Sequence, residues 1–107
     1  MRYGLSAGTI DRINGVLAQF PEIEKALLYG SRAKGNYKPG SDIDLALVGS
    51  RLSSQVLARI NNELDELLLP YKLDTLILAK VTHQDLLDHI QRVGRLFYER
   101  NATPIQP

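Results

Sequence analysis

Residues 30–48 have the sequence GSRAKGNYKPGSDIDLALV, and this stretch decides the fold. Its last seven residues, Asp42 to Val48, have the length and apolar composition of a strand. The residues just before the stretch, Lys25 to Tyr29 (KALLY), predict a short buried strand that ends at Gly30. Three glycines counted from Gly30, together with a proline, predict a polar loop over Ser31–Ser41. Two strands joined by this loop form the centre of the expected sheet.

Helical periodicity flanks these two strands. Apolar residues at spacings of three and four predict a helix from about Ser6 to Phe20. A second amphipathic helix is expected over Ser53–Leu69, followed by a third strand over Lys72–Leu78. Thr82 is expected to open the final helix, because its side chain can cap the first free backbone amides.

The predicted order of elements is helix, strand, loop, strand, helix, strand, helix, which favours the α/β (α+β) class. We expect a small mixed sheet of three to four strands flanked by helices. The second and third strands enclose a helical crossover, so they are expected to be parallel, whereas the first two could be antiparallel. One domain over residues 1–100 is expected, with a frayed tail over residues 101–107.

The composition excludes several classes of protein. A hydrophobic fraction of 44% in 107 residues supports a real core. The absence of cysteine excludes disulfides and thiolate metal sites. A net charge of +1 is too balanced to indicate direct nucleic-acid binding, and the N-terminus has neither a signal peptide nor a membrane anchor. We therefore expect a cytoplasmic protein without a membrane partner.

The first candidate for chemistry is Gly30-Ser31 at the end of the first strand. Glycine allows the backbone to approach a bulky anion, and a serine hydroxyl with the following amides can contact phosphate oxygens. The loop also carries Arg32, Lys34 and Lys38 with no acid before the second strand, so positive charge gathers beside the glycine. This pattern indicates a phosphate site.

The second candidate is the pair Asp42 and Asp44. Alternate residues of a strand face the same side, with α-carbons about 6.6–6.8 Å apart. Two carboxylates that close repel each other unless a cation lies between them, and Mg²⁺ characteristically takes one or two carboxylates plus substrate phosphates. Asp74 interrupts the apolar third strand. A lone buried carboxylate is costly, so we expect Asp74 to face the same site as a third ligand or a general base.

Each motif alone also has an ordinary structural reading. Gly-Ser can be a plain turn, Asp-x-Asp a solvated strand start, and Asp74 an edge carboxylate facing water. Their occurrence on successive predicted strands favours nucleotidyl transfer from a nucleoside triphosphate. His83 and His89 are six residues apart rather than four, so we interpret them as structural or surface residues. Tyr37 could stack on a base or simply lie on the surface.

The segment GSRAKGNYKPGSDIDLAL resembles the signature of the polymerase-beta-type nucleotidyltransferase superfamily: glycine-serine, ten residues, then Asp-x-Asp. Asp74 fits the third carboxylate of that family. The resemblance extends over about residues 6–100 and implies a polymerase-beta-like fold. It implies a nucleotide site at Gly30, Ser31 and Arg32. It implies a metal and catalytic set of Asp42, Asp44 and Asp74.

More narrowly, the short chain resembles the minimal nucleotidyltransferases (MNT), often encoded beside a HEPN-domain toxin. That resemblance implies an antitoxin that transfers AMP from ATP, with Mg²⁺, to a hydroxyl of the partner toxin, a tyrosine in characterised cases. Little sequence is left for an acceptor-binding domain, so a partner or a second copy is expected to complete the acceptor site. Two alternatives stay open: a small-molecule acceptor, and an antitoxin that neutralises its partner by binding without catalysis.

Overall fold

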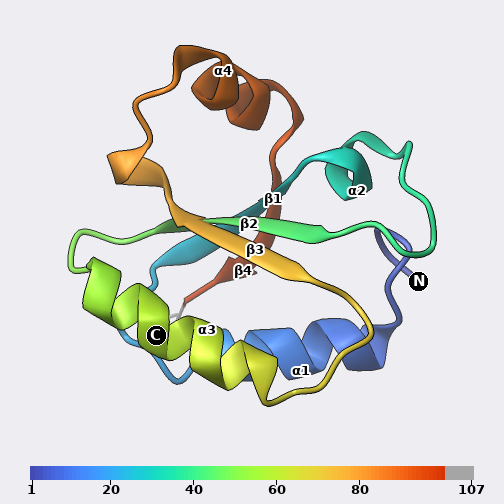
Figure 1. Cartoon of the computed structure of the whole chain (residues 1–107), viewed down its shortest axis with the longest axis horizontal. Helices are drawn as coiled ribbons and strands as arrows, with labels where there is room; N and C mark the ends of the chain where they lie inside the picture. The colour runs from blue at the N-terminus through green and yellow to red at the C-terminus, as the bar shows by residue number, and fades with distance from the viewer. Residues whose placement is uncertain (101–107) are drawn as a thin grey trace, which may run out of the picture.

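The computed structural model describes residues 1–100, and the predicted tail over residues 101–107 lies outside the described residues. Its strands are β1 (Lys25–Tyr29), β2 (Ile43–Val48), β3 (Leu73–Ile77) and β4 (Arg95–Glu99). Its helices are α1 (Ala7–Leu17), α2 (Ser31–Lys34), α3 (Ser54–Asp65) and α4 (Gln84–Val93), with a 3-10 turn η1 (Leu78–Lys80). The strands form one mixed sheet in the order β3-β2-β1-β4, with helices on both faces (Figure 1). The predicted fold class is confirmed.

Strand pairing follows the lengths of the connections. β1 and β2 are antiparallel, and β2 and β3 are parallel, as the sequence suggested. A parallel pair needs a crossover long enough to carry the chain back across the sheet, and α3 provides it. α1 and α3 begin at serines, since the hydroxyl oxygens of Ser6 and Ser53 accept hydrogen bonds from the backbone N–H groups of Thr9 and Val56.

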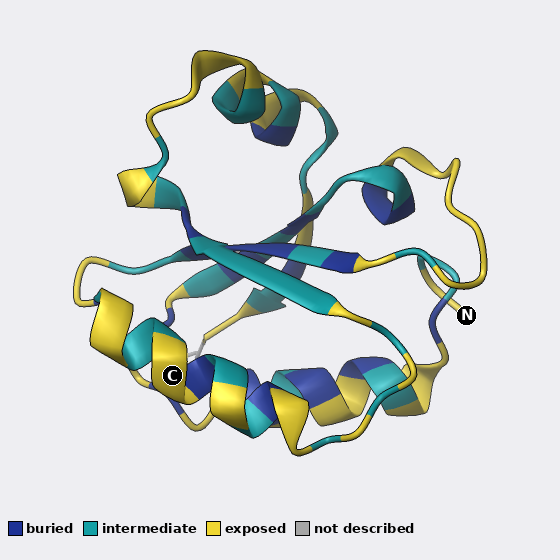
Figure 2. Ribbon diagram, viewed as in Figure 1, coloured by how far each residue is buried: buried dark blue, intermediate teal, exposed yellow. Residues whose placement is uncertain are grey.

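The main core lies between the sheet and the pair α1 and α3 (Figure 1). From the sheet, alternate residues point into it, because successive side chains of a strand face opposite sides. Ala26 and Leu28 of β1 and Ile43, Leu45 and Leu47 of β2 are all fully buried. Figure 2 shows the matching buried stripe on the inner sides of α1 and α3. This layer fixes which face each remaining side chain of the strands must take.

The opposite face of the sheet carries α4 and the short helix α2 (Figure 1). Ile90 is the only buried residue of α4, Ala46 of β2 is also buried on this face, and most side chains of β3 are half-buried. The intervening positions of β1 and β2, including Tyr29 and Asp44, belong to this thinner layer. No helix in residues 1–100 has the length and apolar character needed to cross a bilayer.

Two elements were not predicted. α2 occupies the start of the expected loop, and β4 follows α4 after the single residue Gly94. β4 pairs antiparallel with β1, with a bulge between Ala26 and Leu27. Its partner lies at the other end of the sequence, so nothing local marks this short strand with charged ends.

Three predicted helix boundaries were wrong. The first helix ends at Leu17, not Phe20. The second long helix ends at Asp65, not Leu69, because Leu68 takes a positive φ of 54° that no helix interior tolerates. The final helix is capped by His83 rather than Thr82: the His83 Nδ1 accepts a hydrogen bond from the Leu86 N–H at 3.4 Å. Thr82 lies one residue too early to reach that amide.

Candidate active site

Three carboxylates converge at the start of β2 and β3. Asp44 and Asp74 are direct partners in the parallel register of the two strands, and Asp42 precedes the first residue of β2. Each offers one carboxylate oxygen, and these three atoms lie within 4.8 Å of one another. All three carboxylates of the predicted metal site are therefore brought together.

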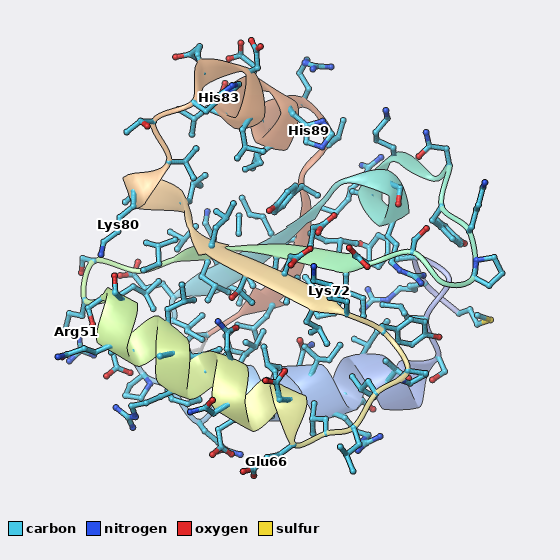
Figure 3. All side chains as sticks on the ribbon, in the orientation of Figure 1. Arg51, Glu66, Lys72, Lys80, His83 and His89 are labelled. Carbon is cyan, nitrogen blue, oxygen red and sulfur yellow. The ribbon has the colours of Figure 1, made fainter. Side chains whose placement is uncertain are left out.

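The core layer explains this convergence. Ile43 is fully buried against the helices, so its neighbours Asp42 and Asp44 face the other side of the sheet. Asp74 is less buried than its apolar strand suggested, with 45% of its side chain exposed and its Oδ1 3.7 Å from the Lys72 Nζ. Figure 3 shows Lys72 at the start of β3.

The cluster is electrostatically unfavourable without a cation. Burial raises the pKa of the Asp44 carboxyl, repulsion from Asp74 and Asp42 raises it further, and only Lys72 lowers it. A hard divalent ion would remove this repulsion, and carboxylate oxygens are the ligands it prefers. The donor set therefore fits Mg²⁺.

Gly30 joins this cluster to the start of α2. It has φ 76° and ψ −157°, a region that only glycine occupies without strain. A Cβ at this position would overlap the carboxylate of Asp44. The absence of a side chain thus lets the backbone of the predicted phosphate loop pass directly against a predicted metal ligand.

Ser31 begins α2 directly after this glycine. The first backbone bond of α2 runs from the Lys34 N–H to the Gly30 carbonyl at 3.0 Å, so the amides of residues 31–33 precede it and have no partner within the helix. Ser31 is half-buried. Its hydroxyl and these amides supply the hydrogen-bond donors that a phosphate group requires.

Arg32 points inward instead of toward solvent. Its side chain is 1% exposed, and its guanidinium donates to the carbonyls of Ser41, Tyr3 and Pro39 at 3.0, 2.8 and 3.1 Å. The guanidinium carbon also lies 5.3 Å and 4.9 Å from the ring centroids of Tyr37 and Tyr71. In this conformation the side chain ties the loop down next to Asp42, whereas its predicted role was contact with the nucleotide.

Two further residues lie at the site: Tyr29, and His89, which the sequence suggested was a structural or surface residue. The His89 Nε2 accepts a hydrogen bond from the Gly30 N–H at 3.1 Å, and its ring meets that of Tyr29 edge to face, with centroids 6.1 Å apart. Burial, followed by the charges of Asp44 and Asp74, raises the pKa of Tyr29 to about 12, so its phenol stays neutral. Fifty-nine positions separate Gly30 and His89. No local spacing reveals that contact.

Solved structures share this fold. The chain is similar to a chain of a toxin–antitoxin structure with AMP-PNP (TM-score 0.69, 21% identity, 84% of this chain and 73% of that chain). It is also similar to a chain of the toxin–antitoxin MntA–HepT (TM-score 0.65, 18% identity, 88% and 73%). A third similar chain comes from the tri-AMPylated HEPN toxin of Shewanella oneidensis in complex with its MNT antitoxin (TM-score 0.56, 17% identity, 85% and 70%).

Sequence comparison gives the family. No curated protein sequence matches the chain. Residues 11–103 match the family described as Polymerase beta, Nucleotidyltransferase. This match includes the glycine-serine turn and all three aspartates, and it spans most of the chain. The sheet order and the converging carboxylates agree with it. The chain belongs to the polymerase beta nucleotidyltransferase family.

Proposed function

We propose that residues 1–100 form a nucleotidyltransferase domain that transfers AMP from ATP, with Mg²⁺, to a tyrosine hydroxyl of a HEPN-domain toxin, and so acts as a cytoplasmic antitoxin. The observation that carries the proposal is the contact between two predicted sites. Gly30 of the phosphate loop passes against the carboxylate of Asp44, within a cluster of three aspartates. A triphosphate held at the loop would therefore have its phosphates beside the metal ligands.

Each group of the site would have a separate role in the transfer reaction. The Ser31 hydroxyl and the amides of residues 31–33 would bind the triphosphate oxygens. Asp42 and Asp44 would hold Mg²⁺, which when bound neutralises charge on the phosphates and on the leaving pyrophosphate. Nearly half of the Asp74 side chain is exposed, so the hydroxyl of an acceptor can reach its carboxylate. We assign it the acceptor side of the site, where it would orient the attacking hydroxyl and take its proton.

The choice of a HEPN-domain toxin as the acceptor is based on similar solved structures. Three observations support a protein acceptor: one similar structure is a toxin–antitoxin with an ATP analogue, another is an MntA–HepT pair, and a third contains an AMPylated HEPN toxin. The acidic cluster also lies on the thinly covered face of the sheet, where a second protein can approach. A HEPN-domain partner fits these observations better than a free small molecule does.

The test mixes the purified chain, the HEPN-domain protein encoded beside it, labelled ATP and Mg²⁺. We expect label on a tyrosine of the partner, located by mass spectrometry. Asp42→Asn and Asp44→Asn should each lower the transfer rate by about a hundredfold or more, the usual cost of removing one charge-stabilising group. Asp65→Asn, an exposed aspartate at the end of α3, is the matched control and should transfer at the normal rate. No label from any of the four nucleoside triphosphates would refute the proposal.

The same variants separate two other functions. If Asp44→Asn neutralises the toxin as well as the native chain does at equal concentration, then binding alone accounts for the antitoxin role. If the native chain labels an aminoglycoside or another small hydroxyl compound but not the partner, then the acceptor is a small molecule. In both cases the Asp65→Asn control must behave as the native chain.

A further inference from the structure

Gly30 is constrained on two sides at once. On one side its α-carbon lies so close to the Asp44 carboxylate that no Cβ fits. On the other side its N–H donates to the His89 Nε2 at 3.1 Å. A glycine with positive φ would otherwise have wide conformational freedom. The contact with α4 therefore supplies a restraint that the backbone itself lacks.

The hydrogen bond fixes the tautomer of the His89 ring. A ring nitrogen that accepts a hydrogen bond carries no proton, so the neutral imidazole must hold its proton on Nδ1. The edge-to-face packing on Tyr29, the residue before Gly30, sets the direction of the ring. Both contacts of His89 thus fall on consecutive residues at the end of β1. Figure 3 shows His89 on α4, on the side toward α2.

The hydrogen bond to His89 removes one backbone donor from the phosphate site. The Gly30 N–H is occupied by His89, so it is not free for a phosphate oxygen. The free donors begin with Ser31 and continue through the first turn of α2. Their positions depend on the direction in which the chain leaves Gly30. His89 therefore does not contact the phosphate itself. It holds Gly30, and the conformation of Gly30 sets the direction of the donors that follow.

We propose that His89 is a positioning residue for the nucleotide site, and that it works by holding the Gly30 amide so that Ser31 and α2 face the acidic cluster. This inference rests on the proposed function for the identity of the ligand. It adds that α4, whose only buried residue is Ile90, is part of the binding machinery through one side chain. The requirement is for a hydrogen-bond acceptor at the position of Nε2, not for a histidine as such.

The test compares three variants of α4 in the full chain. His89→Leu keeps apolar bulk against Tyr29 but removes the acceptor. His89→Gln restores an acceptor, since its amide oxygen reaches about as far as Nε2. His83→Ala removes the cap of the same helix and leaves the Gly30 contact intact, so it controls for general loosening of α4.

Two measurements read the effect. The first is hydrogen exchange of the Gly30 amide in chain labelled with ¹⁵N-glycine, which needs no nucleotide. The second is the affinity for the magnesium complex of α,β-methylene-ATP, an analogue that cannot donate AMP. We expect His89→Leu to speed exchange at Gly30 and to weaken binding about tenfold, the cost of one unpaired, partly buried amide. We expect His89→Gln to restore most of both values, and His83→Ala to leave both near native.

The inference would be overturned by unchanged Gly30 exchange in His89→Leu, by equal loss of binding in His83→Ala, or by no recovery in His89→Gln. A native chain that binds no nucleoside triphosphate would refute the proposed function and this inference together. A native chain that binds nucleotide while His89→Leu binds it equally well would refute the inference alone.

Discussion

The sheet face that packs on α1 and α3 differs from the face covered by α4 in both burial and charge. On the first face, β1 and β2 place five side chains that are fully buried and entirely apolar. On the second face, the same two strands place the half-buried polar residues Tyr29 and Asp44 beside the apolar residues Leu27 and Ala46. Because side chains alternate along each strand, one face of β1 and β2 supplies the buried core and the other face carries the site. A substitution on β1 or β2 should affect one or the other according to the face it occupies.

Adjacent leucines on β1 give the largest expected contrast. Leu28 is fully buried on the core face and Leu27 is half-buried on the α4 face. Leu28→Ala should lower the free energy of unfolding by about 2–5 kcal/mol. Leu27→Ala should lower it by about 1 kcal/mol. Urea unfolding of the two variants measures the difference, and equal losses would mean that the two faces contribute alike.

Glycine 30 is expected to be the exception on the thinner face. Gly30→Ala should cost about 2–4 kcal/mol, because a positive φ is combined with overlap on the Asp44 carboxylate. Gly35→Ala is the matched control, since Gly35 also has positive φ but has open space around it. It should cost only about 1–2 kcal/mol. Thermal unfolding of both variants, with and without Mg²⁺, tests whether close packing at Gly30 is specific to the site.

Arg32 connects the loop to the rest of the molecule, and lysine cannot replace it. One ammonium group cannot reach three carbonyls and stack between two tyrosines, so Arg32→Lys should cost about 1–3 kcal/mol. It should also weaken Mg²⁺ binding, because the released Ser41 is the neighbour of Asp42. Arg59→Lys changes an exposed arginine and should stay within about 0.5 kcal/mol of native. Calorimetry measures the free energy of unfolding and the affinity for Mg²⁺. Native values for both in Arg32→Lys would show that the loop keeps its conformation without Arg32.

The smallest effect concerns the charge of Asp44. Its pKa is raised in the folded chain, so the stability linked to its protonated form is present below the ordinary carboxyl pKa of 3.8 and is lost as pH rises through the raised value. In EDTA at neutral pH, Asp44→Asn should therefore melt at a higher temperature than the native chain, and the gap should close in acid. Mg²⁺ should stabilise the native chain but not this variant. A native chain that is the more stable of the two in EDTA would contradict the assignment.

The parts of the site that the sequence predicted are those set by local patterns. Asp42 and Asp44 could be placed on one face because strand alternation is local, and Gly30 marked the end of β1 because a glycine follows the apolar run. The parallel pairing of β2 and β3 followed from the crossover helix between them. Once β3 is parallel to β2, Asp74 is the acidic residue of β3 that can lie beside Asp44.

The parts that the sequence did not predict depend on contacts between distant residues. β4 needs β1 as its partner, and His89 meets Gly30 only after the whole sheet has formed. The inward turn of Arg32 depends on carbonyls from the N-terminal segment as well as from its own loop. The His83 cap was missed for a simpler reason: threonine is the usual capping residue and lay one position away.

The direct pairing of Asp44 with Asp74 also has a consequence for misfolding. In β3, Leu73, Thr75 and Ile77 alternate with Asp74 and Leu76. If β3 shifted by one residue along β2, Asp74 would point into the apolar core between the sheet and the helices α1 and α3, and Ile77 would point to the opposite face. An isolated carboxylate in such a layer is strongly disfavoured. The acid that serves the acceptor side of the site thus also excludes the misaligned sheet, whether or not a cation is ever bound.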